Sequence, residues 1–213
     1  MTQVDFWFDP VSPYAYLAFE RLPEAFVGVS YSVSYRPIVF AALLRAYAHK
    51  GPAEIEPKRA WTFRQVHWLA HRAGIAIDTP LRHPFNPIAL SRLAWATAPE
   101  GSTPSRFVCE QVLRHVWRGG ADAEDPARFA DLVARLAPAT DPMSDATKQR
   151  LRDATDQALA RGAFGVPTLG IGDRLFWGFD ALEMAAALLR SDPWFDEPHW
   201  QREGAPRGGV QRP

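Results

Sequence analysis

The sequence predicts an α/β fold in which a long helical segment interrupts a small sheet. Near the N-terminus, an apolar run at residues 3–8, a helical pattern at 13–26 and a strict alternation at 29–35 are typical of strand, helix and strand. Between residues 41 and 143 the pattern indicates helices alone. Residues 165–177 then predict two short strands, so the sheet resumes only after the helical segment.

The N-terminal strand, helix and strand form one predicted unit. Short links join them, so the two strands should be parallel and connected by a right-handed crossover. In the second strand, apolar and aromatic side chains alternate with Ser30, Ser32 and Ser34, which is the period of a strand. Arg36-Pro37 is expected to end this strand, because proline has no N–H to donate to the ladder.

The helical segment divides into several predicted helices. A long helix covers residues 57–73 and ends at Gly74. Another covers residues 88–98, and Ser102-Thr103-Pro104 is expected to open the next one. Cys109 lies on the apolar stripe of that next helix, so we interpret it as a core residue rather than a nucleophile.

The C-terminal part supplies the rest of the sheet. Residues 144–161 predict a helix, and Gly172-Asp173 is a tight hairpin signal between the two short strands that follow. Asp180 and Glu183 have the spacing of a capping box. They would begin a last helix that ends near Arg190.

The order β-α-β, helical segment, α-β-β-α is a thioredoxin-like topology with an all-helical domain inserted after the second strand. We expect a discontinuous thioredoxin-like domain at residues 1–40 and 144–192, with the helical insert domain at 41–143. Residues 193–213 contain several prolines and glycines and are expected to form a mobile tail, whose aromatic residues anchor its first part.

Composition limits the functions open to this chain. It has 213 residues, a hydrophobic fraction of 47% and a formal net charge of zero, so no basic surface is predicted to attract nucleic acid. No apolar run is long enough for a membrane span, and no basic-then-apolar leader is seen before the first strand. One cysteine excludes an internal disulfide framework. These features predict a soluble, cytoplasmic protein.

Metal binding is not expected. His67 and His71 are four residues apart on one helix face, which is a metal-ligand spacing. The zincin pattern needs a glutamate directly after the first histidine, and Trp68 stands there instead.

A polar turn, Asp9-Pro10-Val11-Ser12-Pro13-Tyr14-Ala15, joins the first strand to the first helix. It brings the hydroxyl of Ser12 to the helix start, and Pro13 suits the first helical turn because its missing N–H would find no partner there. A helix start offers free N–H groups and about half a positive charge, which can hold an oxyanion or a thiolate. The alternative is that Ser12 only caps the helix, since serine is a favoured N-cap.

Three separated motifs occur together in this sequence. They are Asp9-Pro10-Val11-Ser12-Pro13-Tyr14, Gly162-Ala163-Phe164-Gly165-Val166-Pro167-Thr168 and Phe176-Trp177-Gly178-Phe179-Asp180-Ala181-Leu182-Glu183. In this order, over residues 3–190, the chain resembles the 2-hydroxychromene-2-carboxylate isomerases and the related kappa-class glutathione transferases. Both belong to the superfamily of DsbA-type thiol oxidoreductases.

The resemblance implies that Ser12 and Ala15 stand where the oxidoreductases carry a Cys-x-x-Cys pair. Disulfide exchange by this turn is then unavailable, so the sulfur must come on a ligand, and glutathione is the obvious candidate. Ser12 would be the catalytic residue, donating its O–H to the glutathione thiolate. By analogy with the family, the Val166–Pro167 bond should be cis, and the extended backbone beside it should pair with glutathione like a strand.

Further positions match the family's glutathione site. Pro13 and Tyr14 adjoin Ser12, and Phe179 and Asp180 match the pair that binds the γ-glutamyl end of glutathione. Phe179 replaces the usual small polar residue, a change that preserves a backbone contact and removes a side-chain hydrogen bond.

The helical insert should cover this site. His49 and Lys50 match an asparagine–lysine pair of the family that approaches glutathione, and His49 could either donate a similar hydrogen bond or face solvent. Asn86 could line the substrate cleft or serve as a structural turn residue. Most tryptophans of the insert should be core, but one such as Trp61 could supply a flat wall for an aromatic substrate.

Three functions remain open at this point. The first is a glutathione-dependent isomerase of the 2-hydroxychromene-2-carboxylate type, in which the thiolate adds reversibly to an aromatic hydroxy-keto acid and permits rotation before it leaves. The second is a kappa-like glutathione transferase or peroxidase. The third is a non-catalytic thioredoxin-like scaffold that binds a thiol ligand. The family also implies a homodimer.

Overall fold

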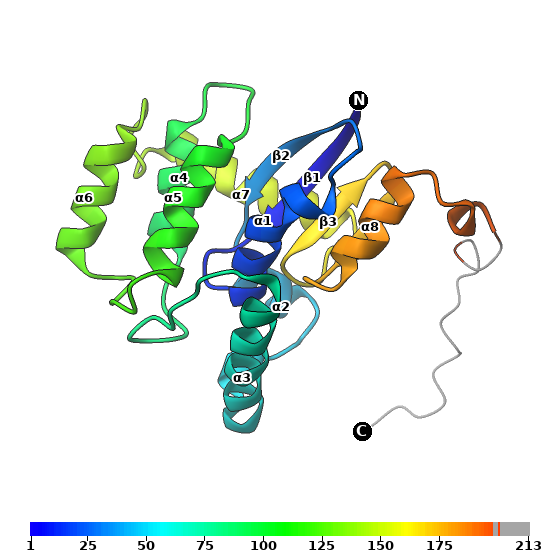
Figure 1. Cartoon of the computed structure of the whole chain (residues 1–213). Helices are drawn as coiled ribbons and strands as arrows, with labels where there is room; N and C mark the ends of the chain where they lie inside the picture. Colours follow the sequence, from blue (N-terminus) through cyan, green and yellow to red (C-terminus); the bar gives the residue numbers. More distant parts are fainter. Residues whose placement is uncertain (198–199, 201–213) are drawn as a thin grey trace.

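The computed structural model describes residues 1–197 and residue 200. Within these residues lies a mixed sheet of four strands in the order β2-β1-β3-β4 (Figure 1). Strand β1 (Thr2–Phe8) runs parallel to β2 (Tyr31–Pro37) and antiparallel to β3 (Thr168–Ile171), which pairs antiparallel with β4 (Arg174–Trp177). Because β1 has a neighbour on each side, the turn that follows it leaves from the interior of the sheet.

Eight α-helices and two short 3₁₀ helices occur in the same described part of the chain. In Figure 1, α1 and α8 lie on one side of the sheet and α7 on the other, and α3 extends away from the sheet. The helices are α1 (Pro13–Ala25), α2 (Phe40–Ala46), α3 (Glu56–Ala73), α4 (Ile88–Thr97), α5 (Arg106–Trp117), α6 (Pro126–Leu136), α7 (Asp145–Ala160) and α8 (Ala181–Leu189), with 3₁₀ helices η1 (Pro52–Glu54) and η2 (Pro193–Asp196).

Alternate side chains of β1 divide the core into two layers. Phe6 faces α1, where its ring centroid lies 6.4 Å from that of Phe19. Trp7, the next residue, points to the opposite face and packs with Leu151 and Ala158 of α7. The layer that contains Phe6 also includes apolar residues of α3, α4 and α5, so the inserted helices share the core of the sheet.

The fold is thioredoxin-like, with helices α2 to α6 inserted after β2, as the sequence predicts. The parallel pairing of β1 and β2 is confirmed, and Gly74 ends α3 with a left-handed backbone at φ 64°. Gly172 turns the hairpin between β3 and β4 at φ 60°. Strand β3 begins at Thr168 rather than at residue 165, because its ladder with β1 starts opposite Trp7.

Two predicted helix starts are wrong in detail. Helix α5 begins after Ser105, whose Oγ accepts a hydrogen bond from Val108 N at 3.3 Å, rather than at residues 102–104. The capping box of α8 is not formed. The backbone of Asp180 is already helical (φ −68°, ψ −23°), and its side chain makes no capping hydrogen bond.

Gly170 of β3 lies directly against the ring of Trp7. A Cβ added at Gly170 would lie 2.6 and 2.8 Å from two atoms of this ring, which is fully buried and cannot move aside. We therefore expect Gly170→Ala to lower the free energy of unfolding by about 1–3 kcal/mol in chemical denaturation. In a double-mutant cycle with Trp7→Phe, which shortens the ring, the two losses should be less than additive. Additive losses would contradict the proposed clash.

The C-terminal segment packs against the sheet as far as it is described. Phe195 of η2 is buried, and the ring of Trp200 stacks on that of Phe176 with centroids 5.6 Å apart. These contacts hold the first part of the predicted tail, and residues 198–199 and 201–213 lie outside the described residues. Within the described part, no helix combines the length and the apolar character needed to cross a bilayer.

Candidate active site

Ser12 is the N-cap residue of α1, directly after the turn that follows β1. Its Oγ accepts a hydrogen bond from Ala15 N at 3.2 Å, and Pro13 takes the first helical position. The capping role that the sequence left open is therefore present. Ser12 is 7% exposed, so the positive end of α1 carries a hydroxyl with limited access to solvent.

The loop that carries Pro167 reaches the same point from the other end of the chain. Ser12 Oγ donates to Val166 O at 3.4 Å, although the two residues are 154 positions apart. The Val166–Pro167 bond is cis, which confirms the prediction. Gly178 N donates to Pro167 O at 2.9 Å and ties this loop to the segment before α8. The start of α1 and the proline loop therefore form one site.

Two aromatic side chains of the inserted segment hold the turn before Ser12. Trp117 Nε1 donates to Pro10 O at 2.9 Å, and His83 Nε2 donates to Val11 O at 2.8 Å. Nε2 must carry the proton, because a carbonyl oxygen can only accept. Burial lowers the pKa of His83 and favours the neutral ring. Nothing in the local sequence around His83 indicates a partner 72 residues away, so its contact with Val11 O could not be predicted from the sequence.

Asp9 is a buried carboxylic acid at the base of the same turn, and sequence reasoning assigned it no role. Its oxygens accept hydrogen bonds from Val11 N and Phe40 N, both at 2.9 Å. Desolvation by burial outweighs these two bonds and raises the pKa of Asp9 to about 7. Asp9 thereby links the turn to the start of α2.

The raised pKa of Asp9 predicts a pH dependence of stability. This pKa is about 7 in the folded chain and about 4 in an unfolded one, so the folded state binds more protons between these values. The stabilising contribution of Asp9 is therefore complete below about pH 4 and is lost as the pH rises to about 7. The free energy of unfolding of Asp9→Asn, measured by chemical denaturation at several pH values in this range, should fall less steeply with pH than that of the wild type. A variant with the wild-type slope would show that Asp9 titrates normally.

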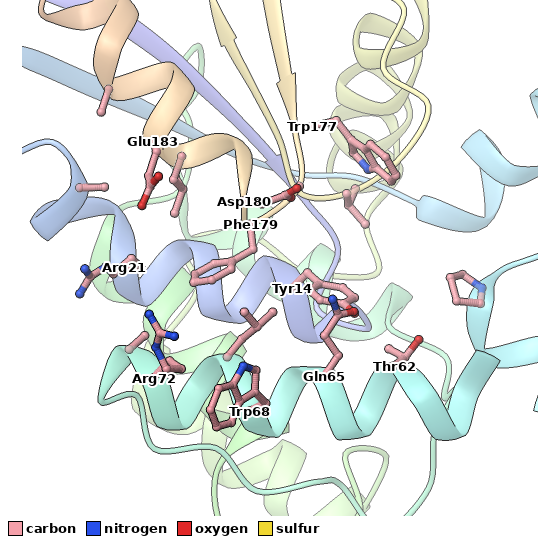
Figure 2. A pocket seen from close by; sticks show the side chains of 18 of the residues that line it. Tyr14, Arg21, Thr62, Gln65, Trp68, Arg72, Trp177, Phe179, Asp180 and Glu183 are labelled. Carbon is pink, nitrogen blue, oxygen red and sulfur yellow. The ribbon is translucent and has the colours of Figure 1, made fainter. Parts of the chain in front are cut away.

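A groove of about 870 Å³ opens beside this turn, between α1, α3, α8 and the proline loop (Figure 2). Tyr14 OH donates to Gln65 Oε1 at 2.7 Å and joins α1 to α3. The volume falls within the range of about 300–1,000 Å³ that is usual for small-ligand sites. Aromatic and charged side chains dominate the part drawn in Figure 2: Tyr14, Arg21, Trp68, Arg72, Trp177, Phe179, Asp180 and Glu183.

The structure brings most of the predicted glutathione-binding residues together in this groove or beside it. Some of them line it and others are buried beside it. Those that line it are Tyr14, Val166, Phe179 and Asp180. Those buried beside it are Ser12, Pro13 and Pro167.

His49 and Lys50 do not line the groove. Both are exposed in the segment between α2 and η1, and the nearest groove-lining residue along the chain is Pro52. His49 N donates to Leu44 O at 2.8 Å, which fixes the backbone after α2. His49 and Lys50 are therefore close to a groove-lining residue along the chain, but they do not line the groove themselves.

The two predicted substrate-cleft residues also lie outside the lining. Asn86 is exposed, and its Oδ1 accepts a hydrogen bond from Ile88 N at 3.1 Å, which is the structural turn role. Trp61 is 62% exposed, and the tryptophan of α3 that lines the groove is Trp68. These two tryptophans lie seven residues apart on the same helical stripe, so periodicity alone could not choose between them.

The described residues offer this site no accessible thiol. Cys109, the sole cysteine of the sequence, is fully buried in the core, and burial raises the pKa of its thiol far above the usual range. A protonated and buried thiol is a poor nucleophile, so the core interpretation of Cys109 is confirmed. In the same part of the chain no His, Cys, Asp and Glu side chains gather into a metal-binding group, and His67 Nε2 contacts Thr79 Oγ1 at 2.8 Å.

The fold and this site define a thioredoxin-like protein in which the turn between β1 and α1 carries a serine and no cysteine. The chain belongs to the family described as DSBA-like thioredoxin domain, which it matches over residues 3–190. The family resemblance of the three sequence motifs is thereby confirmed.

Named relatives fall into two groups. The chain is 27% identical over 199 residues to the 2-hydroxychromene-2-carboxylate isomerase of Sphingobium xenophagum, which covers 87% of this chain and 97% of that protein. It is 23% identical over 203 residues to human glutathione S-transferase kappa 1, with 87% and 90% covered. A solved 2-hydroxychromene-2-carboxylate isomerase shares the fold at a TM-score of 0.76 and 24% identity, over 91% of this chain and 98% of that one.

Proposed function

We propose that this protein is a glutathione-dependent isomerase of the 2-hydroxychromene-2-carboxylate type. The observation that carries the proposal is the hydrogen bond from Ser12 Oγ to Val166 O at 3.4 Å, made at the N-terminus of α1. A hydroxyl, a positive helix end and the backbone of the proline loop thus meet beside a groove of ligand size. The similarity to named isomerases supports the choice of reaction.

The proposed role of Ser12 is to hold a guest sulfur as a thiolate. With Cys109 buried, the sulfur has to arrive on a ligand, and the kappa-class relatives are named for glutathione. Helix N-termini lower thiol pKa values to roughly 3.5–7.5 in comparable sites. When the ligand binds, the hydroxyl of Ser12 turns from Val166 O to the sulfur and adds a charge-assisted hydrogen bond.

Val166, Phe179 and Asp180, which line the groove, would bind the glutathione tripeptide. The backbone at Val166 is suited to pair with the glutathione backbone as an added strand. The exposed carboxylate of Asp180 suits the ammonium group of the γ-glutamyl end. Phe179, which replaces the polar residue of the family, can contribute its backbone N–H and an apolar surface.

The proposed reaction changes the geometry of one double bond. The cyclic hemiketal first opens: its ring C–O bond breaks, the hydroxyl proton passes to the phenol oxygen, and a ketone forms. The thiolate then adds to the carbon conjugated with this ketone, and the electron pair moves to the carbonyl oxygen as an enolate. The former double bond is now single and rotates. When the enolate re-forms the carbonyl, the thiolate leaves and the double bond returns in the trans geometry. No electron is gained or lost overall, so glutathione is regenerated and no redox partner is needed.

A spectrophotometric assay tests this proposal. The wild-type protein is mixed with 2-hydroxychromene-2-carboxylate, with and without glutathione, and the absorbance of the trans isomer is followed. We expect isomer to form only when glutathione is present. Turnover of a general electrophile without isomer would instead support a kappa-type transferase or peroxidase. Calorimetry that detects no binding of millimolar glutathione would support a non-catalytic scaffold.

A further inference from the structure

A second cavity, which we call the β4 cavity, lies beside the last strand of the sheet. Its volume is about 400 Å³, within the range of about 300–1,000 Å³ that is usual for small-ligand sites. Among the described residues, it shares Trp177 and Asp180 with the groove, whereas Phe164 and Met184 line the β4 cavity alone. Apart from Asp180, no residue of this cavity has a role in the proposed isomerisation.

Two half-exposed aromatic rings form an open corner in the β4 cavity. Phe164 and Trp177 are 50% and 54% exposed, and their ring centroids lie 4.8 Å apart with the planes inclined at 55°. A Cβ added at Gly165 would clash with Trp177 Nε1, so this edge of the indole lies against the backbone of the proline loop. The indole is thus held in place while much of its surface stays open. A ligand that covered both rings would gain apolar burial.

The charge at this corner is negative. Within the described part of the chain, Asp180 is the one charged residue that lines the β4 cavity, and it is exposed and makes no capping hydrogen bond to α8. Arg174 of β4 is engaged elsewhere, because its guanidinium lies 5.6 Å from the ring centroids of both Phe195 and Trp200 and its Nη2 donates to Phe195 O at 3.1 Å. A cation from outside could therefore approach Asp180 without displacing an arginine.

We propose that the β4 cavity binds a small organic cation of the alkylammonium class, with its alkyl groups on the rings of Phe164 and Trp177 and its charge beside Asp180. The faces of aromatic rings are electrostatically negative, and tryptophan is the most favourable ring for a cation. The thioether of Met184, a residue that is 42% exposed, adds a polarisable surface. Asp180 would repel an anion, and a neutral ligand of the same shape would gain the apolar contacts alone.

Choline and its uncharged isostere 3,3-dimethylbutan-1-ol test the proposal, because they have nearly the same shape and differ in charge. Each is titrated into the whole chain without glutathione, with calorimetry to measure affinity and proton NMR to detect the upfield shift that ring faces impose on methyl protons. We expect choline to bind about tenfold more tightly than the alcohol and to show this shift. Asp180→Asn should weaken choline binding severalfold and leave the alcohol unchanged. Trp177→Leu should remove most of the preference and of the shift.

The chain offers matched controls for both variants. Trp61, which is 62% exposed on α3, and Asp173, which is exposed in the hairpin between β3 and β4, line neither the β4 cavity nor the groove. Trp61→Leu and Asp173→Asn should therefore bind choline as the wild type does. Phe164→Leu, on the loop before Pro167, tests the same corner without a change in β4.

Two results would overturn the proposal. One is equal affinity of the wild type for choline and the alcohol. The other is an unchanged preference for choline in both Trp177→Leu and Phe164→Leu. Because these titrations contain no glutathione, either result leaves the proposed isomerase standing, and a failed isomerase assay leaves the cation site standing.

Discussion

Replacement of Ser12 by alanine is expected to lower kcat/KM for glutathione-dependent turnover by about 100-fold or more. The variant loses the hydroxyl donor of Ser12 at the N-terminus of α1, and removal of one such donor to a developing anion costs about 10²–10³ in other enzymes. The pKa of the bound glutathione thiol should rise as well, because the helix end alone would have to stabilise the thiolate. Steady-state kinetics and the pH dependence of thiolate absorption measure the two effects.

Ser12 also caps α1, so this variant needs a control for lost stability. Ser105 caps α5 in the same way, with its Oγ accepting from Val108 N at 3.3 Å, and it lies outside the groove lining. Ser105→Ala should lose about 1 kcal/mol of stability, as expected for an N-cap, and should keep wild-type turnover. If Ser12→Ala also kept wild-type turnover, the hydroxyl of Ser12 would be a cap and nothing more.

A second large effect is expected from Trp117→Phe. Trp117 is fully buried, and its Nε1 donates to Pro10 O at 2.9 Å from the last residue of α5. The variant leaves this carbonyl unpaired and opens a cavity, so the free energy of unfolding should fall by about 2–4 kcal/mol. Turnover should fall about tenfold in addition, because the turn that positions Ser12 loses a support.

Trp95 provides a matched control for this change. Its Nε1 donates to Pro37 O at 2.9 Å, again from a buried ring of the inserted helices to a proline carbonyl. Since Pro37 ends β2 and neither residue lines the groove, Trp95→Phe should cost similar stability without lowering turnover of the folded protein. Equal losses of turnover in the two variants would show that Trp117 supports the whole fold and not the turn in particular.

Local patterns were sufficient to predict the main elements of the fold and a serine at the start of α1. The period-two alternation before Arg36, the hairpin at Gly172 and the Ser-Pro start of α1 each depend on neighbouring residues, so the sequence carries them directly. The cis bond before Pro167 was predicted from family resemblance rather than from physics. The resemblance itself depends on three motifs in order over residues 3–190 and not on the residues around Pro167 alone.

The features that sequence reasoning missed depend on contacts between distant segments. His83 reaches Val11 O across 72 positions, and Trp117 reaches Pro10 O across 107. Which tryptophan of α3 lines the groove depends on where α1 crosses that helix, and the stripe shared by Trp61 and Trp68 carries no such information. Helix crossing points and long-range hydrogen bonds arise only when the chain packs.

Under the proposed function, the hydrogen bond from Ser12 Oγ to Val166 O means that the hydroxyl would have to leave this carbonyl when it donates to the sulfur of a bound thiol. At 3.4 Å this contact with a neutral carbonyl is longer than the usual O–H···O hydrogen bond, so the hydroxyl is weakly held. Hydrogen bonds to ionised acceptors are about twice as strong, so under the proposed function a thiolate would draw the hydroxyl away from Val166 O more strongly than a neutral thiol would. Under the proposed function the turn would therefore select the charge state of the incoming atom more than its identity, and a selenolate should compete for the same position.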